Sequence, residues 1–324
     1  GNTVRSGLKH VALGSDDEWV EVPVRLAAPD EDFAVVHHDV RSLHVEGAHV
    51  YVLTRHGVTH WDVDASSSED VWWPHATHLT DLVPLRVNDE LAGFAVTSTS
   101  GLQIIPLLLD GSLAPVEVWS HLEAPSLNTA TLLEVDGANL HLLALGDHGE
   151  GGVWTIAQDL RPTGDVQGEL SSGIMEALSS TNASVTSLAH APAVDGVPTL
   201  FVGTDRGLVV FETSSARDPA LEAAWLFHFS LDQTPVERDL DVLRPLGSSL
   251  NDAPAEVRDI VLDGASLSQT DTAWLAMPSG LHQMDLRTLS ISYGGDLVHP
   301  GKDGRTVSGA NDIHTVLVLD ERLL

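Results

Sequence analysis

Hydrophobic and polar residues alternate through residues 40–63 in three short runs that are separated by turns. The first run ends in Glu46-Gly47, and the third run begins at Gly57 and ends in an aromatic residue and an acid. Alternation with a period of two predicts half-buried β-strands. An acid followed by glycine is typical of a tight hairpin turn, because such turns need a positive φ angle. We therefore predict a unit of three consecutive antiparallel strands.

This unit recurs along the chain, which indicates a repeat protein. The glycine that opens the third strand of each copy is found at Gly7, Gly57, Gly101, Gly152, Gly207 and Gly280. The first strands of five copies begin at Val40, Leu79, Leu127, Val185 and Val257. Most of these glycines lie 44 to 55 residues apart, and spacings of roughly 40–50 residues are typical of four-stranded propeller blades. The longer interval from Gly207 to Gly280 indicates one blade with an insertion around residues 230–252.

The two ends of the chain supply the strands of one further copy. Thr315–Leu319 resembles a second strand, and Leu8–Leu13 resembles a third strand. A ring that is closed by strands from both termini leaves no free sheet edge. We therefore predict an all-β fold in which residues 1–324 form a single six-bladed β-propeller domain, with the last blade closed by the N- and C-terminal strands. A seven-bladed ring is the alternative.

The clearest copy, residues 185–213, combines a Val-Thr-Ser-Leu first strand, an Asp-Gly turn and a Gly-Leu third strand that ends in an acid. This pattern resembles the β-propeller repeats of two-component-regulator sensor domains and of NHL-like propellers. It differs from blades with a Trp-Asp signature, from kelch repeats and from sialidase-like blades. The resemblance implies the propeller fold and a location outside the cytoplasm, either periplasmic or secreted. Function has to be argued from a site, because one fold serves many functions.

The chain is strongly acidic, with 47 Asp and Glu residues against 16 Lys and Arg residues and a net charge of −31. Such a surface repels phosphate backbones and anionic membranes, so we expect no nucleic-acid partner. The acidity either serves solubility or attracts cations or a basic partner. The absence of cysteine excludes thiolate metal sites and cysteine nucleophiles. No apolar run reaches 18 residues, so we predict no membrane-spanning helix.

Polar residues at the starts of the innermost strands form the candidate ligand site, because ligands of propellers meet one end of the central channel. The residues expected there are His37, His38, Asp39, Arg41, His78, Asp81, Asn128, Asn182, Arg258, Asp259, Asn311 and Asp312. Imidazole and carboxylate groups suit Zn²⁺ or another transition metal, and the two arginines suit an anionic ligand. Other histidines, among them His44, His49 and His60, fall at strand or turn positions where we expect no converging partner.

Three further segments carry signals of local structure. Asp62–Asp70 is acidic and is interpreted as a loop; it resembles a Ca²⁺ loop, but Ser67 replaces the glycine and Trp73 the bidentate glutamate. Gly146–Gly152 is interpreted as a flexible loop, because no Gly-Lys-Ser/Thr follows as in a phosphate-binding loop. Gly168–Ser180 includes residues that favour a helical turn.

The sequence contains no G-x-S-x-G or H-E-x-x-H motif, so it carries no serine-hydrolase or zincin signature. We expect a non-catalytic, monomeric scaffold that binds a protein or a small-molecule ligand without a cofactor. A rigid scaffold suits this role, because little ordering entropy is lost when its loops bind. One alternative is a metal-dependent hydrolase or lyase with Zn²⁺ or Ca²⁺ held by His and Asp at the channel. Another is a structural domain of a larger chain.

Overall fold

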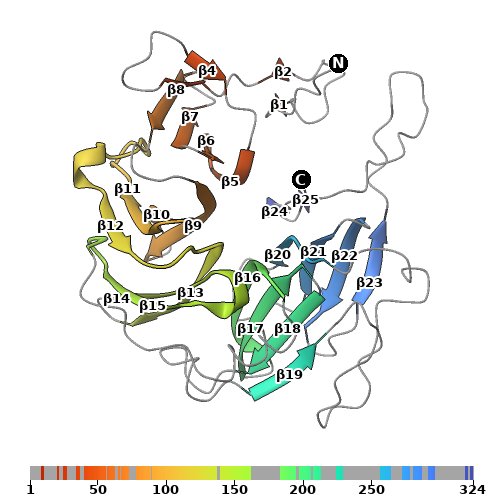
Figure 1. Cartoon of the computed structure of the whole chain (residues 1–324). Helices are drawn as coiled ribbons and strands as arrows, with labels where there is room; N and C mark the ends of the chain where they lie inside the picture. The colour runs from red at the N-terminus through yellow and green to blue at the C-terminus, as the bar shows by residue number, and fades with distance from the viewer. Residues whose placement is uncertain are drawn as a thin grey trace, which may run out of the picture. The chain divides into compact units, whose positions relative to one another are not determined.

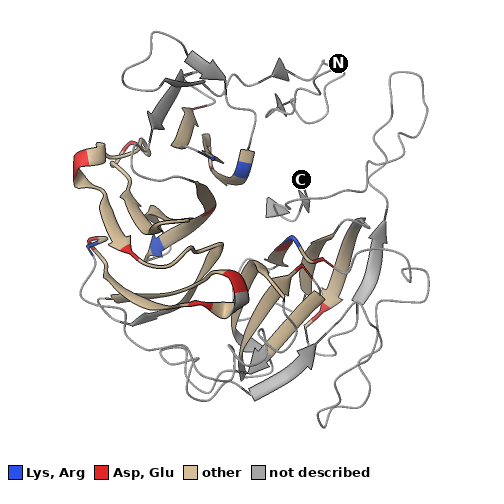
Figure 2. Ribbon diagram, viewed as in Figure 1, with Lys and Arg blue, Asp and Glu red and all other residues tan. Residues whose placement is uncertain are grey.

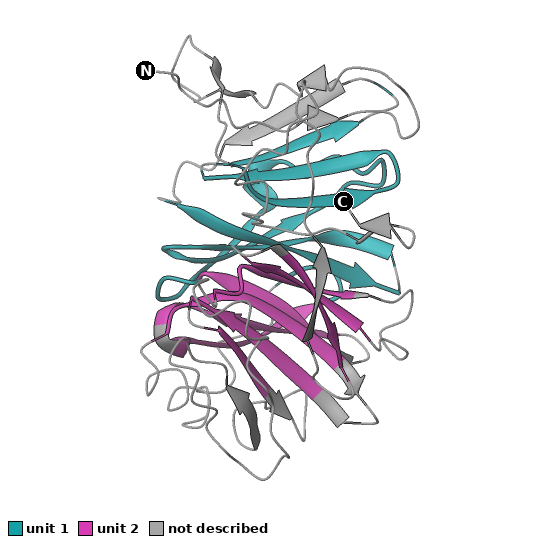
Figure 3. Cartoon of the chain, turned by 90° about the vertical axis from the view of Figure 1, so that its right-hand side faces the viewer, with its two compact units in different colours: residues 1–127, 158–161 teal, residues 128–157, 162–324 magenta. Residues whose placement is uncertain are grey.

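The structure is a computed structural model, and it describes residues 9–10, 20–21, 25–27, 34–36, 40–55, 57–62, 65, 67–72, 78–88, 90–136, 139–161, 183–194, 197–205, 207–212, 224–228, 256–263, 272–277, 280–286, 291–295, 318–319 and 322–323. All regular secondary structure in these residues consists of β-strands and two short 3₁₀-helices, which confirms the all-β prediction (Figure 1). The chain divides into two compact units (Figure 3).

Unit 1 comprises residues 1–127 and 158–161. Its elements are β1 (Lys9–His10), β2 (Val20–Glu21), β3 (Arg25–Ala27), β4 (Ala34–Val36), β5 (Val40–Glu46), β6 (His49–Thr54), β7 (Gly57–Asp62), β8 (Ser67–Trp72), β9 (Leu79–Val87), β10 (Glu90–Ser98), β11 (Gly101–Pro106), η1 (Val116–Val118) and β12 (Ser120–Glu123). Strands β5 to β8 and strands β9 to β12 form two four-stranded antiparallel meanders, and β1–β2 and β3–β4 are two-stranded pairs.

Unit 2 comprises residues 128–157 and 162–324. Its elements are β13 (Thr129–Asp136), β14 (Asn139–Leu145), η2 (Asp147–Gly149), β15 (Gly151–Ala157), β16 (Val185–Val194), β17 (Val197–Thr204), β18 (Gly207–Glu212), β19 (Ala224–His228), β20 (Asp259–Asp263), β21 (Thr272–Met277), β22 (Gly280–Asp285), β23 (Ile291–Gly295), β24 (Val318–Leu319) and β25 (Arg322–Leu323). Strands β16 to β19 and β20 to β23 form four-stranded meanders, β13 to β15 a three-stranded one, and β24–β25 a two-stranded pair.

The turn between the second and third strands has the same construction in several repeats. The residue that ends the second strand pairs with the glycine that opens the third, as in Ser98↔Gly101 and Thr204↔Gly207. Gly101 and Gly207 have φ angles of 128° and 142°, which L side chains rarely adopt. The sequence pattern therefore located these turns because the backbone there requires glycine.

One predicted turn glycine is off by a single position. In the third repeat Leu145 pairs with Gly151, and Gly151 has the positive φ angle of 147°. The glycine that opens the third strand is therefore Gly151 and not Gly152. The preceding segment, predicted to be a flexible loop, contains η2 and is closed by a hydrogen bond of 2.6 Å from the Gly146 amide to the Glu150 carbonyl oxygen.

The acidic segment Asp62–Asp70 is only in part the loop that was predicted. Ser67–Asp70 belong to β8, which pairs with β7 from Asp62↔Ser67 to Gly57↔Trp72. The Ala65 amide donates a hydrogen bond of 2.9 Å to Asp62 Oδ1, a local side-chain bond within the turn between β7 and β8. Pairing with β7 outweighs the low strand propensity of Ser, Glu and Asp here. The carboxylate of Asp62 therefore serves the turn of a hairpin.

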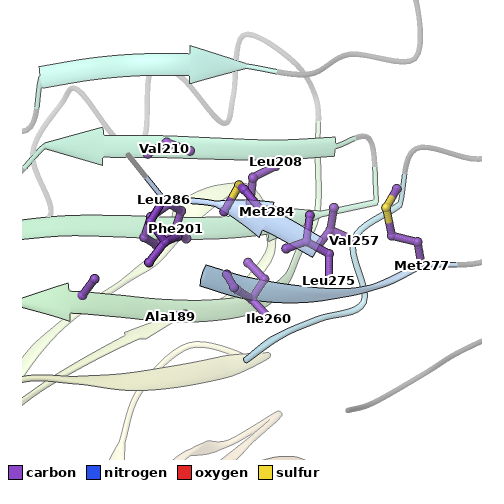
Figure 4. Close-up of a cluster of buried hydrophobic side chains, with 12 residues drawn as sticks. Ala189, Phe201, Leu208, Val210, Val257, Ile260, Leu275, Met277, Met284 and Leu286 are labelled. Carbon is purple, nitrogen blue, oxygen red and sulfur yellow. The ribbon is translucent and has the colours of Figure 1, made fainter. Parts of the chain in front are cut away.

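The middle strands of the meanders are buried on both faces, whereas alternation predicted half-buried strands. All residues of β14 from Leu140 to Leu145 are buried, and so are Val50–Thr54 of β6. In unit 2, a cluster of buried side chains joins the second and third meanders, with Phe201 and Val210 packing against Leu275 and Met284 (Figure 4). Removal of this apolar surface from water, at roughly 25 cal/mol per Å², is the main stabilising contribution.

Several predictions lie outside the described residues. These are the helical turn at Gly168–Ser180 and the insertion at residues 230–252. At the ends of the chain, the described residues show β1 paired with β2 and β24 paired with β25. The strand β25 follows β24, whereas no strand was expected after Thr315–Leu319. Closure of a ring by the two termini stays a prediction.

Candidate functional site

A cavity of about 660 Å³ lies within unit 1. Its walls come from the β5–β6 turn, the β9–β10 turn and the loop at residues 107–112 that follows β11. The described channel-end residues predicted for unit 1, Arg41, His78 and Asp81, lie near the opposite ends of β5 and β9, where these strands begin. The cavity therefore occupies the end of the strands to which sequence reasoning assigned no site.

A group of aromatic side chains lies at this cavity, which His49 and Tyr51 line. The rings of Tyr51 and His60 are stacked with centroids 5.0 Å apart, and His49 Nδ1 lies 3.0 Å from His60 Nε2. Phe94 packs against Tyr51 at a centroid distance of 4.7 Å. Burial, and then the neighbouring His49, lower the pKa of His60. The prediction that His49 and His60 lack a converging partner is wrong, because pairing of β6 with β7 brings the two rings into contact.

The loop at residues 107–112 is held over this stack. The Tyr51 hydroxyl donates a hydrogen bond of 2.7 Å to the Gly111 carbonyl oxygen. Gly111 has a φ angle of 81°, and a Cβ there would lie 2.9 Å from the His49 ring, so glycine is required for the loop to approach. The Ser112 hydroxyl donates a bond of 2.6 Å to Asp110 Oδ1, and this bond is the main reason why the pKa of Asp110 is lowered.

The cavity is acidic. Its carboxylates are those of Glu46, Glu90 and Asp110. Arg86 donates hydrogen bonds to Glu46, one of 3.2 Å between Nη1 and Oε1. Partial burial opposes ionisation of Glu46, but Arg86 outweighs it and lowers the pKa of this carboxyl. Burial, with the nearby charges of Glu46 and Asp110, raises the pKa of Tyr51 to about 12, so its hydroxyl keeps its proton as a donor.

The outer wall of the cavity is aliphatic. Leu91 and Leu107 line it together with the loop-tip residues Leu108 and Leu109. Leu109 is fully exposed and Leu108 is about half exposed (48%). The aliphatic wall of the cavity therefore continues to an exposed loop tip.

The cavity residues could have been found as departures from the repeat. In the described repeats, the positions equivalent to Tyr51 are occupied by Ala95, Leu142, Phe201 and Trp274. The positions equivalent to His60 are occupied by Ile104, Trp154, Val210 and Gln283. Only the first of these repeats thus combines polar aromatic groups on the second and third strands. The sequence therefore contains a signal for these residues, but the repeats can be compared position by position only once the strand register is known.

The predicted channel-end residues of unit 1 lie in local networks. Arg55 Nη2 lies 3.2 Å from His78 Nδ1. Asp81 accepts a hydrogen bond of 2.8 Å from the Leu82 amide. Arg41 is an exposed residue of β5.

In unit 2, Asn128 Nδ2 donates to Asp147 Oδ1 and to the Val185 carbonyl oxygen, at 2.8 Å in both cases. Arg258 Nε lies 3.2 Å from Glu256 Oε2, and Asp259 accepts a bond of 2.9 Å from the Ile260 amide. The remaining candidates lie outside the described residues, namely His37, His38, Asp39, Asn182, Asn311 and Asp312.

Asn128 belongs to a bond that recurs from repeat to repeat. Its partner is the carbonyl of the first residue of the following repeat, and the hydroxyls at the equivalent positions, Thr80 and Thr186, donate to the carbonyls of Leu127 and Val257. A side chain that makes the same backbone bond in successive repeats has a structural role. This position therefore links neighbouring repeats in sequence, whatever else it contacts.

The described part of the chain shows no metal-binding cluster and no membrane-spanning helix. No group of three or more His, Asp or Glu residues there could hold a metal ion. No helix there has the length and apolar character needed to cross a membrane. Acidic residues are spread over turns and strand ends, with few basic ones among them (Figure 2).

No protein-family model matches the sequence, and no curated protein matches it either. Solved structures do match. An auxiliary nutrient binding protein from Bacteroides thetaiotaomicron is 9% identical with a TM-score of 0.51, over 88% of this chain and 65% of that one. The Cps50 (Swd1) β-propeller domain of Myceliophthora thermophila is 12% identical with a TM-score of 0.45, over 79% of this chain and 87% of that one.

The extracellular domain of BT4673 from B. thetaiotaomicron, assigned to a one-component system, is 16% identical with a TM-score of 0.43. The match covers 80% of this chain but spans only 28% of that domain. Among these neighbours, the Cps50 (Swd1) structure is a β-propeller domain, the fold that the repeats predict.

Proposed function

We propose that the protein is a non-catalytic binding module whose ligand occupies the cavity of unit 1. The observation that carries this proposal is the preformed wall of the cavity, in which Tyr51 holds Gly111 and the His49–His60 pair lies beneath the loop. A site that is ordered before the ligand arrives loses little conformational entropy on binding. A volume of about 660 Å³ suits a small molecule or a short segment of a partner.

The wider setting of this proposal is a monomeric six-bladed ring closed by its terminal strands and located outside the cytoplasm. The repeat spacing supports six blades, and the resemblance of the blade pattern to sensor-domain propellers supports the location. The auxiliary nutrient binding protein that shares the fold offers a precedent for a binding role. The predicted channel end remains a second candidate site on the same scaffold.

The proposal can be tested by filling the cavity. Ala92 lines it, and Ala92→Phe places a ring in the ligand volume. A chemically mixed small-molecule library is screened by thermal shift against the native protein and against this variant. We expect compounds that raise the Tm of the native protein and lose most of this effect in the variant, because ligand binding to the folded state raises stability.

The matched control is Val118→Phe, which adds a ring at an exposed position outside the cavity lining. This variant should respond to the same compounds as the native protein does. If every stabilising compound shifts the Tm of Ala92→Phe as much as that of the native protein, the cavity is not the ligand site and the proposal is wrong.

A further inference from the structure

The acidic residues that line the cavity in unit 1 give it a negative charge. Arg86 offsets the charge of Glu46, whereas the lining residues include no Lys or Arg to offset Glu90 and Asp110. The bond from Ser112 stabilises the ionised form of Asp110. An anionic ligand would meet two carboxylates without a countercharge, so the cavity disfavours it by electrostatic repulsion.

The same cavity offers an apolar surface beside these carboxylates. Leu91, Leu107 and Leu108 supply aliphatic groups for a hydrocarbon arm. Both the charged and the aliphatic parts lie within one volume of about 660 Å³. A ligand that contacts both parts carries a cationic head on an alkyl chain.

Tyr51 does not supply an open aromatic face for a sugar ring. The ring of Tyr51 is stacked on His60 at an interplanar angle of 20° and also contacts Phe94. These two side chains take up space beside the ring that a sugar would need for stacking. Binding of a sugar commonly needs an open aromatic face. The acceptors that remain for a ligand favour a donor such as an ammonium group, which has three N–H donors and no acceptor.

We propose that the cavity binds an aliphatic primary amine, with the ammonium group between Glu90 and Asp110 and the alkyl chain against Leu91, Leu107 and Leu108. This inference rests on the proposed function, since it assigns a chemical class to the same site. A free diamine and the lysine side chain of a partner share this chemistry. We commit to the alkylammonium group, and the source is separated by the choice of probe.

The test is isothermal titration of the native protein with three probes of similar length. These are pentane-1,5-diamine, the neutral pentane-1,5-diol and the dianion glutarate. We expect the diamine to bind and to bind at least about tenfold more tightly than the diol, with no measurable binding of glutarate. Nα-acetyl-lysine methylamide is the fourth probe: tighter binding than the diamine assigns the site to a lysine side chain, and weaker binding assigns it to a free amine.

Charge variants test the position of the ammonium group. Glu90→Gln and Asp110→Asn each remove one negative charge at nearly constant shape, and each should weaken diamine binding about threefold to tenfold. Binding of the diol should change less than twofold. The control is Glu123→Gln, an exposed carboxylate on β12 outside the cavity, which should leave the diamine affinity unchanged.

The possible failures are distinguishable. If the diol binds as tightly as the diamine, and Ala92→Phe abolishes both, the site is real but the cationic class is wrong. If Glu123→Gln weakens diamine binding as much as the two cavity variants do, attraction is only to the net charge of the chain, and the inference is overturned. If no compound of the library loses its effect on Tm in Ala92→Phe, the cavity is not a ligand site and the proposed function itself is wrong.

Discussion

At one end of the strands in unit 1, Thr54 and Ser98 each close a turn with the same hydroxyl bond to a glycine carbonyl, of 3.2 and 3.0 Å. At the other end, Tyr51 and His60 stack on each other, and the other described repeats have different residue types at these two positions. Thr204 repeats the first arrangement in unit 2, with a bond of 2.9 Å to the carbonyl of Gly207. The first end therefore has the same hydrogen bond in several repeats, whereas the second end has residues that differ from those of the other repeats.

This difference teaches where to look for function in a repeat protein. Each repeated bond satisfies a backbone group that every blade has to satisfy, so its presence carries no information about a ligand. A side chain that departs from the repeat has no such general reason to be there. Tyr51 on β6 lines the cavity and is such a departure, as is His60 of β7 stacked on it, which is why we place the ligand there.

The largest effect is expected from breaking the repeated turn. Gly101→Ala places a Cβ 2.1 Å from the Leu122 carbonyl oxygen at a φ angle of 128°, so the free energy of unfolding should fall by roughly 3–5 kcal/mol. Gly47→Ala is the matched control, because a Cβ there meets nothing within 4 Å and its φ angle of 59° costs only about 1 kcal/mol. Urea unfolding measures both. Equal losses would show that crowding at Gly101 has no effect.

A second test uses a buried histidine of unit 2 that lies outside the cavity. His190 on β16 is buried, and burial lowers its pKa to about 4. Because the unfolded state binds the proton more tightly, stability should fall as the pH drops from about 6.5 to about 4, by up to about 3 kcal/mol for this group. The variant His190→Leu should lose less stability than the native protein between pH 7 and pH 4 in urea unfolding. Parallel pH profiles would contradict this assignment.

A smaller effect is expected from removing one bond between repeats. Thr186→Val removes the hydroxyl that donates to the Val257 carbonyl oxygen, which should cost about 1.5 kcal/mol. Thr131→Val on β13 is the control, since its hydroxyl takes no part in these bonds. Diamine affinity at unit 1 should stay unchanged in Thr186→Val. A loss of affinity without a loss of stability would show that the repeated position serves the ligand after all.

The smallest effect on stability concerns the cavity itself. Tyr51→Phe removes the bond to the Gly111 carbonyl oxygen and should cost about 1 kcal/mol. Its distinctive result is local: the amides of residues 107–112 should exchange with deuterium faster, while those of the β9–β10 hairpin keep their native rates. Unchanged exchange at 107–112 would mean that Tyr51 does not hold the loop.

Much of the fold was predictable from the sequence, because strands and turns follow from local pattern. Gly101 and Gly207 stand where the backbone requires a positive φ angle, and the pattern found them. At the glycine doublet 151–152 the prediction was wrong by one position, because either glycine satisfies the pattern. Only the pairing of Gly151 with Leu145 shows which glycine opens the third strand. The first four residues of β8 were assigned to a loop, because Ser67–Asp70 favour loops and their pairing with β7 is a tertiary effect.

The candidate site was much less predictable. Tyr51 and Gly111 are 60 residues apart in the chain, and their contact depends on how β6 and the loop after β11 pack. Local periodicity contains no information about such a contact. Residues were chosen for the channel end because of their polar side chains. The side chain of Asn128, however, donates its hydrogen bond to a backbone carbonyl, which local sequence does not reveal.

The central claim is that the ligand binds where unit 1 departs from the repeat. Hydrogen–deuterium exchange of the native protein, with and without saturating pentane-1,5-diamine, tests it most directly. We predict slower exchange at residues 107–112 and unchanged exchange at residues 78–82, where β9 begins. Slower exchange at 78–82 with no change at 107–112 would contradict the account and return the ligand to the predicted channel end.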